Sequence, residues 1–251
     1  MCDIITVTNQ KGGIGKSTTA HQLGAGYSII KGLKVLMIDL DPQANLTIAT
    51  GVKRYMPSSY DLLMLKNTPS EVIQSISDKL DIIPASNQLS RIAIELDKTG
   101  KEYRLKEVLV PVKDKYELII IDTPPALGIL TINALTIAKR IVIPAQADLF
   151  SLEAIKELAD TISVVKKYTN HDLRIEGILL TRYQPRSILT KELTELIEET
   201  SVTLQTKVFK SKIREAIAIK EAQAMHQDIF SYAPKSKVAN DYQEFLAELE
   251  S

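Results

Sequence analysis

A glycine-rich stretch, KGGIGKST at residues 11–18, constrains the fold of this chain more than any other feature. It follows an apolar, β-branched run at residues 4–8 and precedes a helical stretch at residues 17–30. Glycines in such a loop let the backbone turn tightly and bring its N–H groups close to a polyphosphate. A strand, a glycine loop and a helix in this order are the context that a P-loop requires, which predicts a nucleotide-binding site.

The lysine and serine of this loop have expected roles in that site. Lys16 should reach the β- and γ-phosphates, and the Ser17 hydroxyl should bind Mg²⁺. The loop nevertheless departs from the standard pattern G-x-x-x-x-G-K-S/T, because Gln10 stands where that pattern places its first glycine. A second lysine, Lys11, precedes the glycines. Lys11 is either a solvated loop lysine or part of the site.

Short apolar runs alternate with longer helical patterns along the chain. The predicted strands are residues 4–8, 35–39, 80–84, 118–122, 141–144, 175–180 and 206–209, and the predicted helices include 17–30, 152–168 and 190–199. The strand runs are nearly continuous in Val, Ile and Leu, which is typical of parallel strands covered on both faces. The pattern predicts an α/β fold: a doubly wound, mostly parallel sheet flanked by helices, in one domain over residues 1–251.

Carboxylates follow two of the predicted strands, at the edge where ligands bind in such sheets. Asp39 and Asp41 stand in DLDPQAN, and Asp122 ends the apolar run of LIIIDTPP, which resembles a Walker B segment. Asp41 is expected to orient or activate the attacking water. The predicted metal-binding residues are Ser17, Asp39 and Asp122. The alternative reading of DLDPQAN is a helix cap or a solvated turn.

The composition narrows the classes of function. The chain has 251 residues, 25% of them charged, and a formal net charge of +0, which argues against a uniformly basic nucleic-acid binder but permits a local patch. Cys2 is the single cysteine and cannot form an internal disulfide or a thiolate metal cluster. No run reaches the roughly 18 apolar residues of a membrane helix, and the N-terminus lacks the charged region of a secretion signal. A cytoplasmic protein is expected.

Taken together, KGGIGKST, DLDPQAN and LIIIDTPP resemble the motifs of the ParA/MinD family of deviant Walker A ATPases, within the SIMIBI class of P-loop NTPases. The strings NQKGG and DLDPQ point to the ParA (Soj-like) branch. The likeness extends to IVIPAQAD, to ILLTRYQPRS and to the C-terminal region, so it covers nearly the whole chain. The resemblance implies a fold of the SIMIBI type and an ATPase that requires ATP and Mg²⁺ and segregates plasmids or chromosomes. It also implies an ATP-bound homodimer that binds DNA non-specifically at the nucleoid and is stimulated by a ParB-type centromere-binding protein.

The resemblance also assigns roles to individual residues. Lys11 matches the family's signature lysine, which crosses the dimer interface to phosphate on the partner's ATP. The catalytic residues implied are Lys11, Lys16 and Asp41. The nucleotide-binding residues implied are Lys11, Gly12, Gly13, Ile14, Gly15, Lys16, Ser17, Thr18, Thr181 and Arg182, the last two near the adenine. A trans-acting lysine is physically reasonable, because the site motifs contain no arginine, and an added cation accelerates related NTPases by about 10³–10⁵.

Basic residues gather between Lys207 and Lys220, where five cations stand against one acid. The expected DNA contacts are Arg186, Lys210, Lys212 and Arg214. No zinc finger or convincing helix-turn-helix is present, so the contact should be sequence-independent and sensitive to salt. Only about ten residues precede the P-loop, so an N-terminal helix-turn-helix domain is not expected. The alternative reading of the basic segment is a solvated helix face.

Two other functions compete with DNA partition. A MinD-like ATPase that associates with membranes would need a basic, amphipathic C-terminal helix, whereas residues 241–251 contain four acids and no lysine or arginine, so no membrane partner is expected. A metabolic P-loop enzyme or a nitrogenase-type reductase is the third possibility. The reductase needs several cysteines for an iron–sulfur cluster, which Cys2 alone cannot supply.

Overall fold

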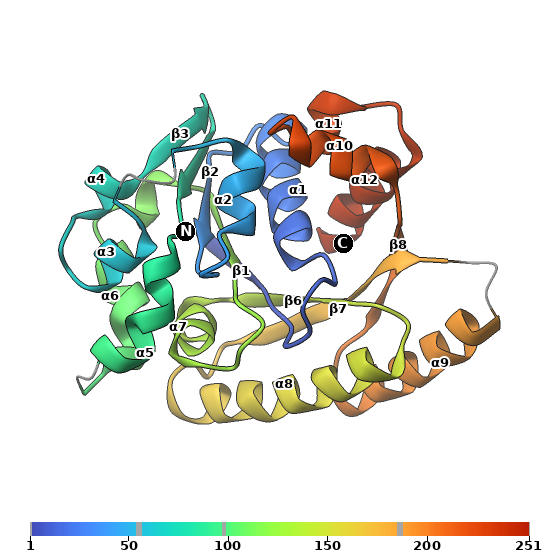
Figure 1. The fold of residues 1–251 in the computed structure, drawn as a ribbon. Coiled ribbons are helices and arrows are strands. Elements are labelled where there is room, and N and C mark those ends of the chain that lie inside the picture. The colour runs from blue at the N-terminus through green and yellow to red at the C-terminus, as the bar shows by residue number, and fades with distance from the viewer. Residues whose placement is uncertain (1, 54–56, 97–98, 185–187, 251) are drawn as a thin grey trace.

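An eight-stranded sheet forms the centre of the molecule (Figure 1) in a computed structural model that describes residues 2–53, 57–96, 99–184 and 188–250. The strands are β1 (Asp3–Val7), β2 (Val35–Asp39), β3 (Gln74–Ser77), β4 (Leu80–Ile83), β5 (Leu118–Asp122), β6 (Arg140–Ala145), β7 (Arg174–Tyr183) and β8 (Val208–Arg214). Their order across the sheet is β3-β4-β2-β5-β1-β6-β7-β8. Within the described residues every neighbouring pair is parallel except β3 and β4.

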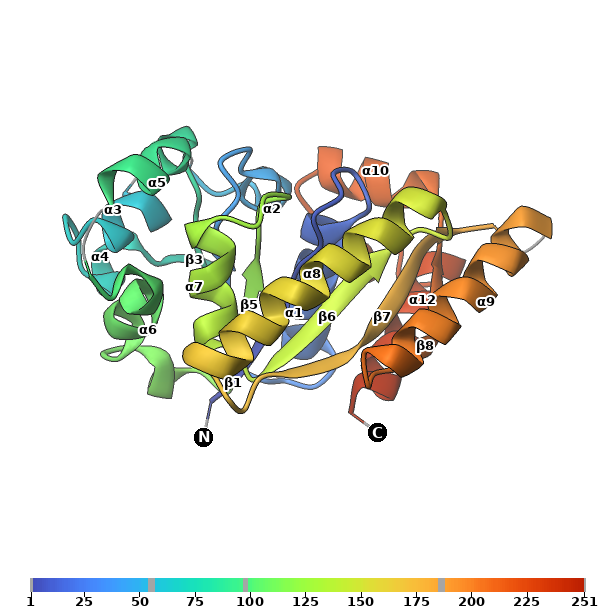
Figure 2. The same cartoon turned by 90° about the horizontal axis from the view of Figure 1, so that it is seen from below.

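Helices cover both faces of this sheet. They are α1 (Lys16–Ile29), α2 (Asn45–Thr50), α3 (Ser59–Leu63), α4 (Pro69–Val72), α5 (Ile92–Glu95), α6 (Arg104–Leu109), α7 (Ile129–Ile137), α8 (Leu149–Tyr168), α9 (Ile188–Thr203), α10 (Ile217–Ala224), α11 (Ile229–Tyr232) and α12 (Lys237–Leu249). Short 3-10 turns lie at Asn87–Arg91, Lys101–Tyr103 and Lys113–Lys115. Figures 1 and 2 show α1, α2 and α10–α12 on one face, with α7, α8 and α9 on the other.

The central strands β2 and β5 are apolar up to their final aspartate because both of their faces are buried. In β5, Leu118 and Ile120 pack in the cluster formed with α1 and α12, whereas Ile119 and Ile121 pack in the cluster formed with α3, α6 and α7. Successive side chains of a strand point to opposite faces, so one continuous aliphatic run supplies two cores. A third cluster joins β6 and β7 to α8 and α9.

The predicted fold class is confirmed, and all seven predicted strands are present, two with the predicted bounds and five with shifts at their ends. The prediction for the last strand was wrong at both ends, because β8 begins at Val208 and continues to Arg214 instead of covering residues 206–209. The sequence analysis also missed β3. Its residues, QSIS, are mostly polar because β3 lies at the edge of the sheet and exposes alternate side chains.

The last helix, α12, is amphipathic and packs its apolar side into the core. Val238, Tyr242, Phe245 and Leu246 are buried, and the ring of Phe245 meets that of Phe209 on β8 edge-to-face, with 4.9 Å between the centroids. The apolar face that a membrane-binding helix would need is therefore used inside the protein. Among the residues described here, no helix is long and apolar enough to cross a bilayer.

A buried histidine on α1 makes stability depend on pH. His21 is almost completely buried, and its Nδ1 has no hydrogen-bond partner among the described residues. Burial lowers the pKa of His21 to about 4, although the negative charge of Asp228 opposes this shift. In the unfolded chain the pKa returns to about 6.5. Between these two pKa values the unfolded state binds a proton at His21 and the folded state does not. The free energy of unfolding therefore falls as the pH drops from about 6.5 toward about 4.

We expect His21 to lower the free energy of unfolding by about 2 kcal/mol between pH 7 and pH 5. The variant His21→Gln cannot take up this proton, so its unfolding free energy should change less over the same interval. Urea unfolding at the two pH values measures the difference. His171 is exposed, so His171→Gln is the matched control and should keep the original pH dependence. The same pH dependence in His21→Gln and the original chain would contradict a buried neutral imidazole.

Candidate nucleotide-binding site

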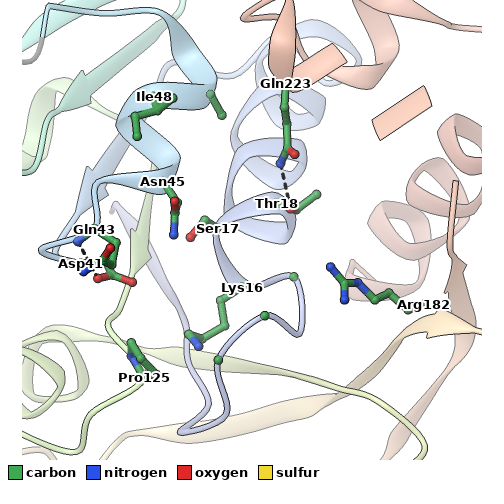
Figure 3. Close-up of a pocket in the computed structure, with 14 residues that line it drawn as sticks. Lys16, Ser17, Thr18, Asp41, Gln43, Asn45, Ile48, Pro125, Arg182 and Gln223 are labelled. Atoms are coloured by element: carbon green, nitrogen blue, oxygen red, sulfur yellow. Dashed lines mark hydrogen bonds between the residues drawn. The ribbon is translucent and has the colours of Figure 1, made fainter. Parts of the chain in front are cut away.

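The glycine loop follows β1 and leads directly into α1, the helix that begins with Lys16, Ser17 and Thr18 (Figure 3). Gly13 and Gly15 have φ angles of 74° and 87°, a left-handed region in which any side chain would be strained. Gly15 is also the N-cap of α1, so its conformation determines where the helix begins. The loop and the helix N-terminus together form an anion-binding end, as the P-loop prediction requires.

Two buried polar side chains anchor this loop to the neighbouring strands. Asn9 donates from Nδ2 to the Pro144 carbonyl oxygen on β6 at 2.7 Å, and its Oδ1 accepts from the Lys11 N–H at 3.2 Å. Thr181 on β7 donates from its hydroxyl to the Ile14 carbonyl oxygen at 2.7 Å. The sequence analysis missed Asn9, although it lies inside the NQKGG string that marked the family.

Lys16 lies buried in the first turn of α1, and its side chain curls back over the loop. Its Nζ donates to the Lys11 carbonyl oxygen at 2.7 Å. Burial lowers the pKa of Lys16, whereas the charges of Asp122 and Asp41 raise it. The ammonium therefore stands between the loop and two carboxylates, at the place where a P-loop holds phosphate.

Asp39, at the end of β2, organises the turn that leads to α2. Its Oδ2 accepts the N–H and the hydroxyl of Thr47 at 2.9 and 2.7 Å, and its Oδ1 accepts the N–H of Asp41 at 3.0 Å. Burial raises the pKa of Asp39 to about 6, although these hydrogen bonds lower it. The geometry gives this carboxylate a role in shaping the turn, and its metal role stays a prediction.

Asp122 lies at the end of β5, paired in register with Asp39 on β2. It is fully buried, and neither of its carboxylate oxygens has a hydrogen-bond partner in the described residues. Burial raises the pKa of Asp122 well above its usual value, and the charges of Asp39 and Asp41 add to the shift. The nearby Ser17 hydroxyl and the Lys16 ammonium oppose this shift. A buried carboxylate whose oxygens form no regular hydrogen bond fits a cation, so Asp122 and Ser17 are suited to Mg²⁺.

The donor set suits magnesium in particular. Within the described chain, no group of three or more His, Cys, Asp or Glu side chains is arranged to hold a metal ion. Mg²⁺ does not need such a cage, because it keeps several waters and is usually held by one or two protein oxygens together with substrate phosphates.

A cleft of about 470 Å³ opens in front of the loop. Asp41, Gln43 and Asn45 form one of its walls, and Lys16 and Ser17 lie opposite (Figure 3). The Gln43 N–H donates to Asp41 Oδ1 at 2.9 Å, which holds this carboxylate at the wall. The arrangement leaves Asp41 facing the space where the terminal phosphate and a water would lie.

Lys11 does not belong to the lining of this cleft. Its Nζ forms an ion pair with Asp148, the N-cap residue of α8, and lies 5.8 Å from the ring centroid of Phe150. Burial raises the pKa of Asp148, but the hydrogen bonds from Lys11 and Ser151 outweigh this effect, and the net shift is downward. Phe150 is 73% exposed, so Lys11 stands at the surface beside an exposed ring.

A smaller cavity adjoins the cleft beside Gly15 and Thr18. Arg182, at the end of β7, lines both cavities and has a φ of 48°, which is uncommon for a residue with a side chain. Thr181 and Ile213 also line the smaller cavity. The two residues predicted near the adenine are therefore brought beside the P-loop, and their contact with the base stays a prediction.

The basic residues predicted to contact DNA do not share a helix face. Lys210 and Lys212 lie on strand β8, and Lys212 Nζ is 4.5 Å from the ring centroid of Tyr183. Arg214 donates from Nε and Nη2 to Asp241 on α12, at 2.7 and 2.6 Å. That pairing offsets the charge of Arg214, which leaves the two lysines as the freer cations. Arg186 lies outside the described residues.

The fold and the site define a P-loop nucleotide-binding protein with a parallel α/β sheet. A glycine loop caps the P-loop helix, a lysine and a serine begin that helix, and two neighbouring strands end in carboxylates. These are the elements that bind a nucleoside polyphosphate and its magnesium ion.

Comparisons with known proteins narrow this class. A family model described as an AAA domain matches residues 2–175. The sporulation initiation inhibitor protein Soj of Bacillus subtilis (strain 168) is 40% identical over 253 residues, which cover 99% of this chain and 98% of that protein. The chromosome-partitioning ATPase Soj of Treponema pallidum (strain Nichols) is 37% identical over 247 residues, 98% of this chain and 96% of that protein.

A solved structure of a similar protein contains an ATP analog and magnesium. Cobyrinic acid a,c-diamide synthase from Mycobacterium smegmatis, with a bound ATP analog and magnesium, aligns with a TM-score of 0.85 and 30% identity over 98% of this chain and 93% of that one. The chain belongs to the AAA domain family and, within it, to the ParA/Soj-like proteins, so the resemblance seen in the motifs is confirmed. The prediction of ATP and Mg²⁺ as cofactors is confirmed as well.

Proposed function

We propose that this protein is a DNA-partitioning ATPase that hydrolyses Mg·ATP during the segregation of a plasmid or chromosome. The observation that carries the proposal is the placement of two loop lysines, with Lys16 inside the cleft and Lys11 outside it beside Asp148. In this proposal residues 1–251 act as one domain, in the cytoplasm and on the nucleoid. The name of the chromosome-partitioning ATPase Soj of Treponema pallidum supports the ATPase and partition parts of this proposal. We propose in addition that the ATP-bound form is a homodimer that a ParB-type protein stimulates.

Each side chain has its own part in the proposed reaction. Lys16 exchanges its bond to the loop carbonyl for contacts with the β- and γ-phosphates. Ser17 and Asp122 hold the magnesium ion, which when bound neutralises the charge that develops on the phosphates. Asp41 orients the attacking water and accepts its proton, a role for a carboxylate held at the wall of the cleft.

Lys11→Ala should still bind ATP but fail to form the ATP-dependent dimer and lose stimulated turnover. The side chain lies outside its own cleft, so its removal leaves the cleft lining intact. A cation supplied by a neighbour accelerates related NTPases by about 10³–10⁵. Calorimetry measures ATP binding, and light scattering after size-exclusion chromatography measures the dimer. Lys167→Ala, an exposed lysine at the far end of α8, is the control and should dimerise normally.

An ATP-dependent dimer of unchanged stability in Lys11→Ala would refute the trans role of this lysine. Lost ATP binding in the same variant would instead place Lys11 in its own nucleotide site. The two outcomes are distinct because the two measurements are made separately.

We further propose that the dimer contacts DNA phosphates through Lys210, Lys212, Arg214 and Arg186 without reading the base sequence. Two unrelated duplexes should then bind with similar affinity, with ATP present and not with ADP or without nucleotide. The double variant Lys210→Ala/Lys212→Ala should weaken both complexes alike and reduce the slope of log affinity against log salt by about 2 for each protomer that contacts the DNA.

The matched control for this DNA experiment is Lys106→Ala/Lys115→Ala, two exposed lysines outside β8, one on α6 and one in the 3-10 turn before β5. It removes the same charge and should leave DNA binding unchanged. If neither duplex binds in the presence of ATP, the partition proposal is overturned. If the two double variants lose the same DNA affinity, the loss comes from the change in net charge and not from contacts made by Lys210 and Lys212.

The synthase structure favours a second candidate, an ATP-dependent amide-forming enzyme. Such an enzyme phosphorylates a carboxylate, and ammonia or an amine then displaces the phosphate to form the amide, so its turnover of ATP needs a carboxylic acid and a nitrogen donor. ATP hydrolysis that is accelerated by DNA and a ParB-type protein, with no added acid, favours partition over this alternative.

A further inference from the structure

Two cavities meet at the start of α1, and four residues line both of them. These are Gly15, Thr18, Arg182 and Gln223. In the proposed ATP site the larger cavity holds the polyphosphate, and the smaller one lies beyond it. The α-phosphate, which joins the polyphosphate to the sugar of the nucleotide, must therefore lie at the boundary between the two cavities. Thr18 and Gln223 meet at this boundary. The inference below rests on this proposed function.

Gln223 on α10 is hydrogen-bonded to Thr18 on α1, as the dashed line in Figure 3 shows. Its amide nitrogen, Nε2, lies 3.0 Å from Thr18 Oγ1. An amide nitrogen can only donate, so the threonine hydroxyl is the acceptor of this bond. The proton of the hydroxyl is then left for another partner.

Among the described residues the Thr18 hydroxyl donates to no protein acceptor, so its proton is available to a ligand at the boundary of the two cavities. A helical threonine commonly donates to the carbonyl four residues earlier, which for Thr18 is that of Ile14. The Ile14 carbonyl oxygen already accepts the Thr181 hydroxyl at 2.7 Å. A phosphate oxygen at the boundary of the two cavities is a stronger acceptor, because it is charged.

We propose that Gln223 is a positioning residue for nucleotide binding. By donating to Thr18 it turns the threonine hydroxyl into a donor aimed at the α-phosphate of the bound nucleotide. No motif marks Gln223, because it lies 205 positions from Thr18 in the sequence and is brought there by the packing of α10.

Hydrogen bonds to α1 and α2 hold in place the segment that carries Gln223. His226, just beyond its end, bonds through Nδ1 to the Ile48 carbonyl oxygen on α2 at 2.8 Å. Ile229 further along donates its N–H to Gln22 Oε1 on α1 at 2.8 Å. The segment that carries Gln223 is therefore attached to α1 and α2 at separate points, and the amide is held in place before nucleotide arrives.

The test uses the full chain and Mg·ADP, which binds without hydrolysis. Gln223→Leu keeps the approximate volume and removes the donor, and it should weaken ADP binding by about threefold to tenfold in calorimetry, the worth of one hydrogen bond. Gln223→Glu should weaken ADP binding further, because a carboxylate accepts the threonine proton and repels the phosphate. Gln227→Leu, exposed and beyond the end of α10, is the control and should bind ADP normally.

A double-mutant cycle separates positioning from a structural role. In a Thr18→Val background, which has no hydroxyl, Gln223→Leu should have no further effect on the ADP dissociation constant. In a Thr18→Ser background, which keeps the hydroxyl, the effect of Gln223→Leu should persist. Equal losses in all three backgrounds would overturn the proposal, as would unchanged ADP binding in Gln223→Leu. Failure of the unaltered chain to bind ADP would instead overturn the proposed nucleotide site.

Discussion

Replacing Lys16 with alanine should abolish ATP binding at concentrations that saturate the unaltered protein. Lys16 Nζ is the cation held inside the cleft, where it lies between the loop carbonyl of Lys11 and the carboxylates of Asp41 and Asp122. A charge-assisted hydrogen bond contributes about 1.5–3 kcal/mol, and the lysine is expected to make two with phosphate oxygens, so affinity should fall by at least about 100-fold.

The fold should survive this change. Burial lowers the pKa of Lys16, which means that its charged form is costly in the empty cleft, and alanine has no such cost. Thermal unfolding without nucleotide should therefore show no loss of stability. Lys31→Ala, an exposed lysine just beyond α1, is the control and should bind ATP normally. Normal calorimetric binding of ATP by Lys16→Ala would refute the site.

Replacing Asp41 with alanine should preserve ATP binding and the ATP-dependent dimer while stopping turnover. The carboxylate lies at the wall of the cleft, opposite Lys16 and Ser17, and takes no part in the loop that holds the phosphates. A positioned general base contributes about 10²–10⁴ in rate. Phosphate release under single-turnover conditions should therefore fall by about this factor.

A second variant separates the chemistry of Asp41 from its structural contact. Its Oδ1 accepts the Gln43 N–H at 2.9 Å, and asparagine can keep that bond but cannot take a proton at neutral pH. Asp41→Asn should lose turnover as fully as Asp41→Ala. Asp78→Ala, exposed in the turn between β3 and β4, should hydrolyse ATP normally. A monomer in the presence of ATP, or retained hydrolysis, would count against the assigned role.

Much of the fold could be predicted because the central strands carry their own signal. Residues of β2 and β5 are buried on both faces, so the four positions before the final aspartate are all apolar and the run stands out without any knowledge of its neighbours. Elements at the edge of the sheet lack this signal. The short β3 is half polar, and β8 is mixed because its cations alternate with the buried Phe209 and Ile213.

The candidate site divides in the same way. The P-loop, Asp41 and Asp122 were predictable, since each follows a strand whose end lies at the ligand-binding edge. Asp148, which holds Lys11, and Gln223, which holds Thr18, were not singled out. Their partners lie 137 and 205 positions away in the sequence, and a contact over that distance leaves no local pattern.

The sequence by itself determined the class of this protein: its alternating aliphatic runs specify a parallel sheet, and its glycine loop specifies a phosphate site. The reason is that both depend on local chemistry, namely side-chain burial and backbone freedom. The tertiary structure decided which of the charged groups in and near the site form ion pairs and which are buried. It paired Arg214 with Asp241 and Lys11 with Asp148, and it buried Asp122 beside Ser17 and Lys16 with no ion pair. Such pairings depend on which helices pack against the sheet and at what point along it, and no short segment of the chain contains that information.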